Sequence, residues 1–394
     1  EVMAGITTFM TMAYILAVNP SVLGSTGMDT TAVLLATALA SCLGTLCMAF
    51  MANLPFALSA GMGLNAFMAY TVVAGYGYSW QVALLAVFIE GLLFIVLSLT
   101  NVREAIFNAI PLTLKKGGSV GSGLFIAFIV LQNSCLCVDS ATLVGIISFP
   151  ENFHTAGICA LLTLIGLFFT AVFYTRKMKG AILYGILLTW ILGMLCQVTG
   201  LYVPTPDAGF YSLFPSWGMT DFSKLGLTFG QCFNVDFSAV GIVNFIVVIF
   251  SFLFVDIFDT LGTLIGVATK AKMLDKDGKL PGIKPALLAD SIATSAGAIL
   301  GTSTTTTFVE SASGVAVGGR TGLTALVTGI LFLVSTLFAP IFTAIPSFAT
   351  APALIMVGFL MVGTVTEINF DLDNLTESIP AYLALIAMPL FYSI

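Results

Sequence analysis

Residues 301–320 read GTSTTTTFVESASGVAVGGR, a polar stretch inside a chain that is otherwise largely apolar. The four threonines of residues 304–307 are β-branched and favour an extended backbone. The small residues that follow Glu310 favour a helix that packs closely on its neighbours. A helix over residues 309–317 spans only about 14 Å of a hydrocarbon core that is about 30 Å thick. Extended residues 302–308 add about 23 Å, so strand and helix together are long enough to cross.

A crossing broken in this way predicts a binding site. Non-helical backbone survives at membrane depth only where protein or a water-filled cavity satisfies its amides. Transporters place such broken segments around their substrate, and this break carries a carboxylate, Glu310. The alternative is an ordinary polar loop outside the membrane, which the count of crossings given below disfavours.

The composition is that of a membrane protein. The 394-residue chain is 58% hydrophobic and only 8% charged, with a mean hydropathy of +1.08, whereas soluble domains carry about 25% charged residues. We therefore predict an all-α polytopic membrane protein. The single histidine, His154, excludes a His-based metal site, and the seven cysteines contain no CxxC pair. No basic patch suggests a nucleic-acid partner, and no cofactor is expected.

Eleven unbroken apolar segments are predicted to cross the membrane: 5–19, 32–52, 80–99, 118–132, 154–174, 179–200, 239–261, 285–301, 321–344, 350–365 and 376–394. Residues 53–74 (NLPFALSAGMGLNAFMAYTVVA) and 302–318 are two further, broken crossings. With a cytoplasmic N-terminus, twelve of the thirteen basic residues fall on the cytoplasmic side, and Lys224 is the exception. Treating either broken segment as a loop would reverse every later crossing, so both are counted.

The two broken crossings belong to similar surroundings. LLAT at residues 34–37 precedes the break at 59–65, and LLAD at 287–290 precedes the break at 304–310. Seven crossings separate the copies, and an odd number inverts the second copy, as in inverted-repeat transporters. We therefore expect a first repeat, an extracellular linker and a second repeat at residues 1–200, 201–238 and 239–394. Seven plus seven segments require a fourteenth crossing, so the last segment is expected to be missing from this chain.

Five carboxylates are predicted at membrane depth, where ionisable groups are costly and usually functional: Glu90, Asp256, Asp259, Asp290 and Glu310. Asp256 and Asp259 are three residues apart on one helical face, and two such carboxylates repel, so one is expected to hold a proton near neutral pH. The alternative is a structural pair hydrogen-bonded to serine or threonine. Hydrogen bonding between helices explains Asp290 as well as function does, and a structural or interface role is favoured for Glu90.

Asn65, in SAGMGLNAF, is the counterpart of Glu310 in the first broken crossing. Its amide both donates and accepts hydrogen bonds, as recognition of a heterocycle edge requires. Phe67 and Phe308 are candidates to cover the faces of a flat ligand. With 33 phenylalanines in the chain, ordinary packing is the more common role for any one of them.

Several stretches carry a family resemblance: GITTFMTMAYILAVNP, SAGMGLNAF, EGLLFIVLSLTNVREAIFNAIP, GLFIAFIVLQNS, DIFDTLGTLIGVA and ADSIATSAGAILGTSTTTTFVESASGVAVGGRTGLTA. In these stretches the chain resembles the nucleobase–cation symporters, specifically the adenine/guanine/hypoxanthine permeases of the AzgA-like branch. The resemblance implies a 7+7 inverted-repeat fold with interleaved core and gate domains. It also implies that the third and tenth segments each pair a short strand with a half-helix.

The resemblance further implies proton-coupled purine uptake through the cell membrane. Carried over residue by residue, the substrate-site acid of the eighth segment falls on Asp256 and its companion carboxylate on Asp259. The glutamate of the tenth segment falls on Glu310, and the asparagine of the third segment falls on Asn65.

The predicted function is therefore secondary active, proton-coupled uptake of a purine base. Asp256 and Glu310 are expected to accept N–H groups of the base from opposite sides, and Asp259, followed by Asp256, to carry the proton. An enzyme is not expected, because the chain lacks a nucleophile–His–acid set and metal ligands. The alternatives are a uracil, xanthine or other small-solute carrier of the same fold, and a channel, although no ring of pore residues is evident. The preferred purine, proton or sodium coupling, and homodimer formation stay open.

Overall fold

The protein is predominantly helical, as the sequence predicts. The computed structural model describes residues 1–100, 111–140, 143–150, 152–205, 210–215, 218–236, 240–270, 272–273, 280–368, 370–371 and 374–391. Several basic residues of the topology prediction fall in 101–110 and 274–279, outside the described residues, as does part of the predicted linker. Within the described ranges, eight helices are long and apolar enough to span a membrane: Val2–Gly24, Thr30–Ala52, Trp80–Leu99, Phe153–Thr175, Ala181–Val198, Ile242–Leu264, Ile283–Leu300 and Gly322–Thr343.

The first four segments contain two irregular crossings. In order they comprise α1 (Val2–Met12), α2 (Ile15–Gly24), α3 (Thr30–Cys47) with a π-helical end (Met48–Ala52), β1 (Leu58–Ala60), α4 (Met62–Ala66) with a π-helical continuation (Phe67–Gly75), and α5 (Trp80–Leu99). The helix of the first crossing is interrupted between α1 and α2, at Ala13 and Tyr14. Asp29 caps α3 by accepting the Ala32 N–H, which satisfies a backbone donor that the helix itself leaves unpaired.

The middle of the chain contains α7 (Leu112–Asn133), β2 (Cys137–Ser140), β3 (Leu143–Ile146), a π-helical turn (Phe153–Gly157), α8 (Ile158–Thr175) and α9 (Ala181–Val198). Strands β2 and β3 form an antiparallel hairpin that was not predicted from the sequence. Two 3₁₀ turns follow α9, at Phe222–Leu227 and Gln231–Phe233. They pack on α3 and α5, and Lys224 pairs with Asp29 at 3.1 Å.

The second half begins with the long helix α10 (Ile242–Lys270). It continues with α11 (Ile283–Leu300), β4 (Thr305–Thr307), α12 (Ser311–Val317), α13 (Gly322–Ser335), a 3₁₀ turn (Thr336–Phe338), α14 (Ala339–Thr343), α15 (Ser347–Val362), a 3₁₀ turn (Gly363–Glu367) and α16 (Leu375–Phe391). The order α11–β4–α12 repeats the order α3–β1–α4 of the first half.

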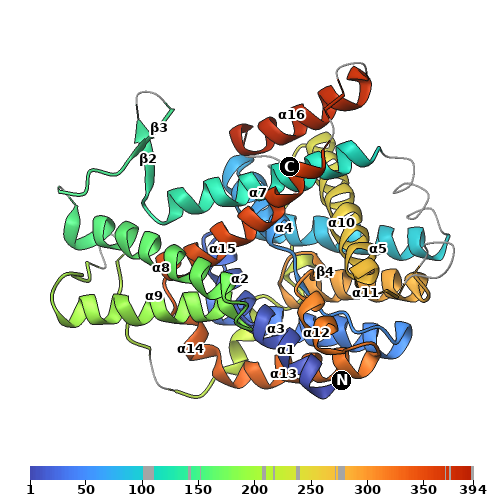
Figure 1. The fold of residues 1–394 in the computed structure, drawn as a ribbon, viewed down its shortest axis with the longest axis horizontal. Helices are drawn as coiled ribbons and strands as arrows, with labels where there is room; N and C mark the ends of the chain where they lie inside the picture. The colour runs from blue at the N-terminus through green and yellow to red at the C-terminus, as the bar shows by residue number, and fades with distance from the viewer. Residues whose placement is uncertain are drawn as a thin grey trace.

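The two broken crossings meet through their strands. β1 pairs with β4 in antiparallel register, with Ser59 opposite Thr306. All six paired residues are buried, so the pairing satisfies backbone groups that water cannot reach. The prediction of two strand-plus-half-helix segments is therefore correct, and in Figure 1 β4 and α12 lie among α1, α3, α10 and α11.

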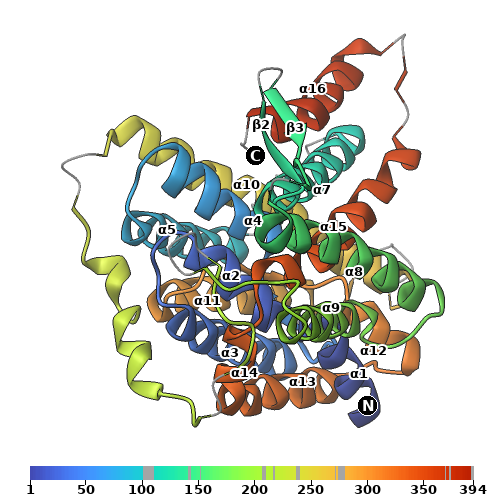
Figure 2. The same cartoon turned by 90° about the vertical axis from the view of Figure 1, so that its left-hand side faces the viewer.

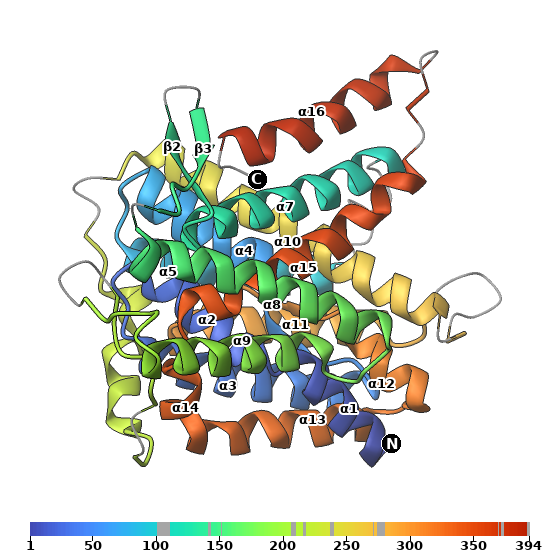
Figure 3. The ribbon, with the colours of Figure 1, turned by 60° about the vertical axis from the view of Figure 1, so that its left-hand side comes forward.

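The helices form two packed groups. In the first group α2, α3, α10 and α11 contact the paired strands, and α1, α4, α5, α12 and α13 pack on these helices or on one another; in the second group α7, α8, α9, α15 and α16 pack on one another. Figures 2 and 3 show α16 lying over α7 at the edge of the second group. Small residues allow the close approach of α8 and α9: a Cβ on Gly185 would lie 1.9 Å from Thr170 Oγ1. Contacts between the two groups include those of α2 with α15, α4 with α7, and α1 with α9.

Candidate functional site

Asn65 lies on α4, immediately beyond β1, and its side chain is fully buried. Its Oδ1 accepts a hydrogen bond from Ser303 Oγ, which belongs to the segment leading into β4. Its Nδ2 has no hydrogen-bond partner among the described residues. A buried donor left unpaired costs about 1–3 kcal/mol. The amide of Asn65 is therefore a donor with capacity for a ligand, next to the strand pair.

Glu310 lies just before α12 and is half-buried. Its Oε1 accepts a hydrogen bond from the Tyr14 hydroxyl at 2.9 Å. Tyr14 lies at the break between α1 and α2, and only 1% of it is exposed. This tyrosine was not predicted from the sequence as a site residue. The signal that could have found it is its place within an apolar crossing, inside the first of the stretches that carry the family resemblance.

The two aspartates of α10 have different partners. Asp256 is fully buried, and Thr260 Oγ1 lies 2.9 Å from its Oδ1 and 3.0 Å from Oδ1 of buried Asp290 on α11. One hydroxyl proton serves only one of these two acceptors at a time. Asp259 is only half-buried, and its Oδ2 accepts from Thr306 of β4 at 3.2 Å. The hydroxyl partners that a structural pair would require are present at both aspartates.

Glu90 ties α5 to the entrance of β4. It is fully buried, and its Oε2 accepts a hydrogen bond from Thr304 Oγ1 at 2.8 Å. Because Thr304 directly precedes the strand, this bond fixes the backbone from which the site is built. The structural or interface role favoured for Glu90 from the sequence stays a prediction.

The two aromatic candidates flank the paired strands. Phe67 follows α4, is 1% exposed and meets Phe252 edge to face, with ring centroids 5.0 Å apart. Phe308 is buried, and its N–H donates to Ala57 O at 3.0 Å, which extends the pairing of β1 and β4 by one further bond. Both rings contribute to packing next to the site.

The site offers several acceptors and a donor around the strand pair. Asp259 contacts Thr306 of β4, the strand that leads into Glu310, so two carboxylates lie beside the strand pair and the site disfavours an anionic ligand. No group of three or more metal-ligating side chains occurs in the parts of the chain that the structure describes. Carboxylate oxygens with an amide N–H suit a neutral ligand that carries both N–H donors and ring acceptors.

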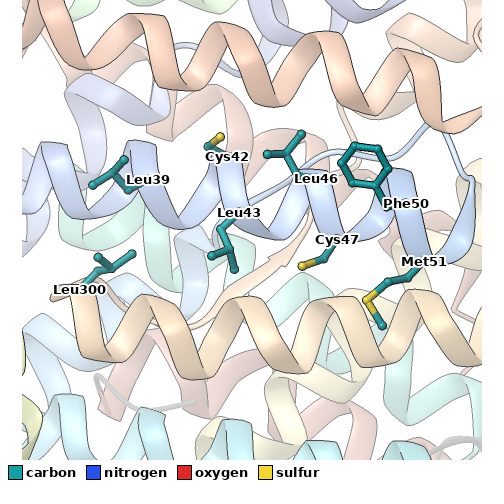
Figure 4. Close-up of a pocket in the computed structure, with 8 residues that line it drawn as sticks. All are labelled: Leu39, Cys42, Leu43, Leu46, Cys47, Phe50, Met51 and Leu300. Atoms are coloured by element: carbon teal, nitrogen blue, oxygen red, sulfur yellow. The ribbon is translucent and has the colours of Figure 1, made fainter.

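A separate groove of ≈ 510 Å³ lies along α3 and the end of α11. Figure 4 shows that its lining side chains are apolar or cysteine: Leu39, Cys42, Leu43, Leu46, Cys47, Phe50, Met51 and Leu300. Such a lining has no strong hydrogen-bond donor or acceptor to recognise a polar heterocycle edge. None of the predicted site residues lines this groove.

The sequence model of the Permease family matches residues 1–391. The chain belongs to this family. The permease is 46% identical over 404 residues to the guanine/hypoxanthine permease PbuG of Bacillus subtilis, a match that covers 100% of this chain and 87% of the relative. It is 40% identical over 397 residues to the adenine permease AdeQ of Escherichia coli, covering 100% of this chain and 83% of that relative. The resemblance inferred from the sequence is thus confirmed.

The permease also shares its fold with a solved structure, the transmembrane domain of the cyanobacterial bicarbonate transporter BicA. The TM-score is 0.69 at 15% sequence identity, covering 99% of this chain and 95% of that domain. At this identity the likeness concerns the fold alone. The predicted class, a 7+7 inverted-repeat transporter fold, is confirmed. With its apolar helices, the permease is an integral membrane protein.

Proposed function

We propose that this permease takes up purine nucleobases, such as adenine, guanine or hypoxanthine, together with a proton. The observation that carries the proposal is the combination of an unsatisfied Asn65 amide with the Glu310 carboxylate, one at each broken crossing. A purine presents both N–H donors and ring acceptors, so it matches a site that both accepts and donates. The names of the relatives, which include guanine/hypoxanthine and adenine permeases, support the same substrate class.

Within this proposal each site residue has a separate role. Glu310 and Asp256 accept N–H groups of the base, and Asn65 completes the recognition of its edge. Phe67 and Phe308 cover the faces of the ring. Asp259 carries the coupled proton, with Asp256 as the second proton carrier, because carboxylates in a low-dielectric site are the groups able to exchange a proton near neutral pH.

The proposed transport cycle moves two bodies against each other. Helices around the strand pair form the core domain, and the group of α7, α8, α9, α15 and α16 forms the gate domain. The first repeat comprises residues 1–200, the extracellular linker residues 201–238 and the second repeat residues 239–394, with the N-terminus in the cytoplasm. Proton and base bias the rocking of the core only if they bind its two states unequally.

Replacement of the tenth-segment acid tests the substrate site. Glu310→Ala should abolish saturable uptake of radiolabelled hypoxanthine, guanine and adenine by cells without other purine carriers, because it removes an acceptor for the base. Asp221→Ala is the control: it removes an exposed carboxylate on the predicted linker and should leave uptake unchanged. Equal uptake by Glu310→Ala and the unsubstituted protein, at equal amounts in the membrane, would dismiss the assignment. Competition by uracil and xanthine tests the alternative substrates.

A gradient-swap experiment tests the coupling ion. In vesicles containing the purified permease, an imposed inward proton gradient should drive accumulation of the base above its external concentration, and a sodium gradient should not. Accumulation driven only by sodium would contradict proton coupling. Uptake that merely equilibrates under both gradients would contradict secondary active transport and favour a facilitator or a channel.

A further inference from the structure

We propose that Tyr14 is a positioning residue for substrate recognition: its hydroxyl holds the Glu310 carboxylate in the orientation and the ionised form that accept an N–H group of the base. This inference rests on the proposed function, since it assumes that Glu310 contacts the transported base. It adds the first crossing to a site that the sequence assigns only to the third, eighth and tenth segments. The assignment depends on the geometry around the break between α1 and α2.

The hydrogen bond between Tyr14 and Glu310 has a defined direction. The phenol oxygen lies 2.9 Å from Oε1 of Glu310, and a neutral phenol has a single proton to donate. The ring is 1% exposed, so packing prevents the side chain from swinging to another partner. Among the described residues, Tyr14 supplies the one side-chain hydrogen bond to this carboxylate. An ionised oxygen is the better acceptor for such a donor, so the contact favours the ionised carboxylate.

The backbone around Tyr14 fixes where its hydroxyl lies. Regular helix stops at Met12 and resumes at Ile15, and Val18 N–H donates to the Tyr14 carbonyl at 3.0 Å. One turn earlier, Thr11 Oγ1 lies 2.9 Å from Ser313 Oγ on α12. The first crossing is therefore tied to the tenth segment at two successive points, and only the second point involves the acid.

Other carboxylates lie near Glu310, so its ionised form depends on the hydrogen bond from Tyr14. Asp259 on α10 accepts a hydrogen bond from Thr306, four residues before Glu310 in the same crossing, and Asp290 on α11 lies next to Asp256 through the shared Thr260 hydroxyl. Beyond the far end of α12, the guanidinium of Arg320 donates to the Val315 and Gly319 carbonyls. Nearby like charges and burial both disfavour the ionised form of a carboxylate. The hydrogen bond from the Tyr14 hydroxyl favours that form and so counteracts both effects.

The neighbouring carboxylates have other partners. At the N-terminal start of the first crossing, Glu1 accepts a hydrogen bond from Thr324 Oγ1 at 2.6 Å, on α13 rather than α12. Asp256 contacts Thr260 on its own helix, and Glu90 contacts Thr304. Each of these carboxylates thus has a threonine hydroxyl partner, and the phenol of Tyr14 is assigned to Glu310.

Tyr14→Phe tests the inference by removing only the hydroxyl. Hydrogen bonds to charged groups contribute about 1.5–3 kcal/mol, so the KM for hypoxanthine should rise about 10- to 100-fold, while kcat changes little, as expected for loss of uniform binding. The acid limb of the pH–uptake profile should also move toward neutral pH. The movement follows because a carboxylate without its donor takes up a proton more readily.

Two controls separate positioning from packing. Thr11→Val cuts the neighbouring bond between the same two segments without touching Glu310, and should leave both KM and the acid limb unchanged. Tyr202→Phe removes the hydroxyl of another buried tyrosine, which donates to the Tyr211 carbonyl at 2.8 Å, and should also leave them unchanged. Glu310→Asp is a comparison variant: its shorter side chain withdraws the carboxylate from Tyr14 and from the base together, so its effect on KM should be at least as large as that of Tyr14→Phe.

The outcomes are distinct. A higher KM and a shifted acid limb in Tyr14→Phe, with Thr11→Val unchanged, support the inference. Unchanged KM and pH profile in a well-folded Tyr14→Phe protein overturn it, as do equal effects of Tyr14→Phe and Thr11→Val. Normal purine uptake with an unaffected Tyr14→Phe variant removes this inference alone, whereas absence of purine uptake by the unsubstituted permease removes the proposed function and this inference together.

Discussion

Gly314→Ala measures how closely the first crossing must approach α12. A Cβ at Gly314 would lie 2.0 Å from Thr8 Oγ1 and 2.8 Å from the Ala4 carbonyl oxygen, whereas ordinary contact begins at 3.4 Å. The Thr8 hydroxyl can rotate away, but the Ala4 carbonyl belongs to the backbone. To restore the 3.4 Å of ordinary contact from 2.8 Å, α1 must therefore move away from α12 by about 0.6 Å. Overpacking of this kind costs about 1–3 kcal/mol.

The same retreat acts on the site. It would lengthen the 2.9 Å bonds from Thr11 to Ser313 and from Tyr14 to Glu310 to about 3.5 Å, beyond good hydrogen-bond geometry. We expect Gly314→Ala to lower the thermal midpoint in detergent and to reduce hypoxanthine uptake at equal membrane levels by about tenfold or more. Adding Thr8→Ala to this variant should restore only part of the thermal midpoint and part of the uptake, because the clash with the Ala4 carbonyl oxygen stays.

Gly118→Ala provides the matched control for this substitution. Gly118 lies within α7, where a Cβ would meet no heavy atom of the described residues within 4 Å. Alanine there should therefore be neutral or stabilise the helix by up to about 1 kcal/mol. Normal uptake and an unchanged thermal midpoint in Gly314→Ala would show that α1 and α12 are not in tight contact. The first crossing would then not support the site in the way described.

Two further substitutions test the buried and the surface polar contacts. Thr260→Val removes the hydroxyl between Asp256 and Asp290 and should destabilise the protein by about 1.5–3 kcal/mol. The thermal midpoint should therefore fall, and Thr260→Ser should keep it close to that of the unsubstituted protein. An unchanged midpoint in Thr260→Val would contradict the hydrogen-bonded bridge. Burial raises the pKa of Asp29, but hydrogen bonds from Ala32 N–H and Lys224 outweigh it and hold that pKa below its usual value. Ionised Asp29 therefore stabilises the fold above its unfolded pKa, and this stabilisation is lost as pH falls through the lower folded pKa. In Lys224→Met the stabilisation should begin to be lost at a higher pH. At neutral pH this substitution should lower the free energy of unfolding by less than about 1 kcal/mol. Identical acid-unfolding curves would refute the pairing.

The broken crossings could be predicted because their local signals agree. Four threonines, an acid and a small-residue run specify strand, break and half-helix in that order, and the bilayer does not accept an unpaired strand. The antiparallel pairing of β4 with β1 and its register come from the structure, because the sequence of either segment alone does not identify its partner. The observed strand and half-helix, Thr305–Thr307 and Ser311–Val317, lie within the predicted extents.

The partners of the acids could not be predicted from their spacing. Helical periodicity places Asp256 and Asp259 on one face, but which helix faces each carboxylate depends on packing between distant segments. The contact of Asp256 with Asp290 through Thr260 joins α10 to α11, and that of Tyr14 with Glu310 spans 296 positions of the chain. The β2–β3 hairpin was missed because its short strands follow a helix without a strong turn signal in the sequence.

The most direct test of the proposed site is a structure of the permease with a bound purine base. We predict that the base lies at the junction of β1 and β4, with one edge within hydrogen-bond distance of the Glu310 carboxylate and the Asn65 amide. A base bound instead in the apolar groove along α3, or anywhere that leaves both side chains without contact, would contradict this prediction.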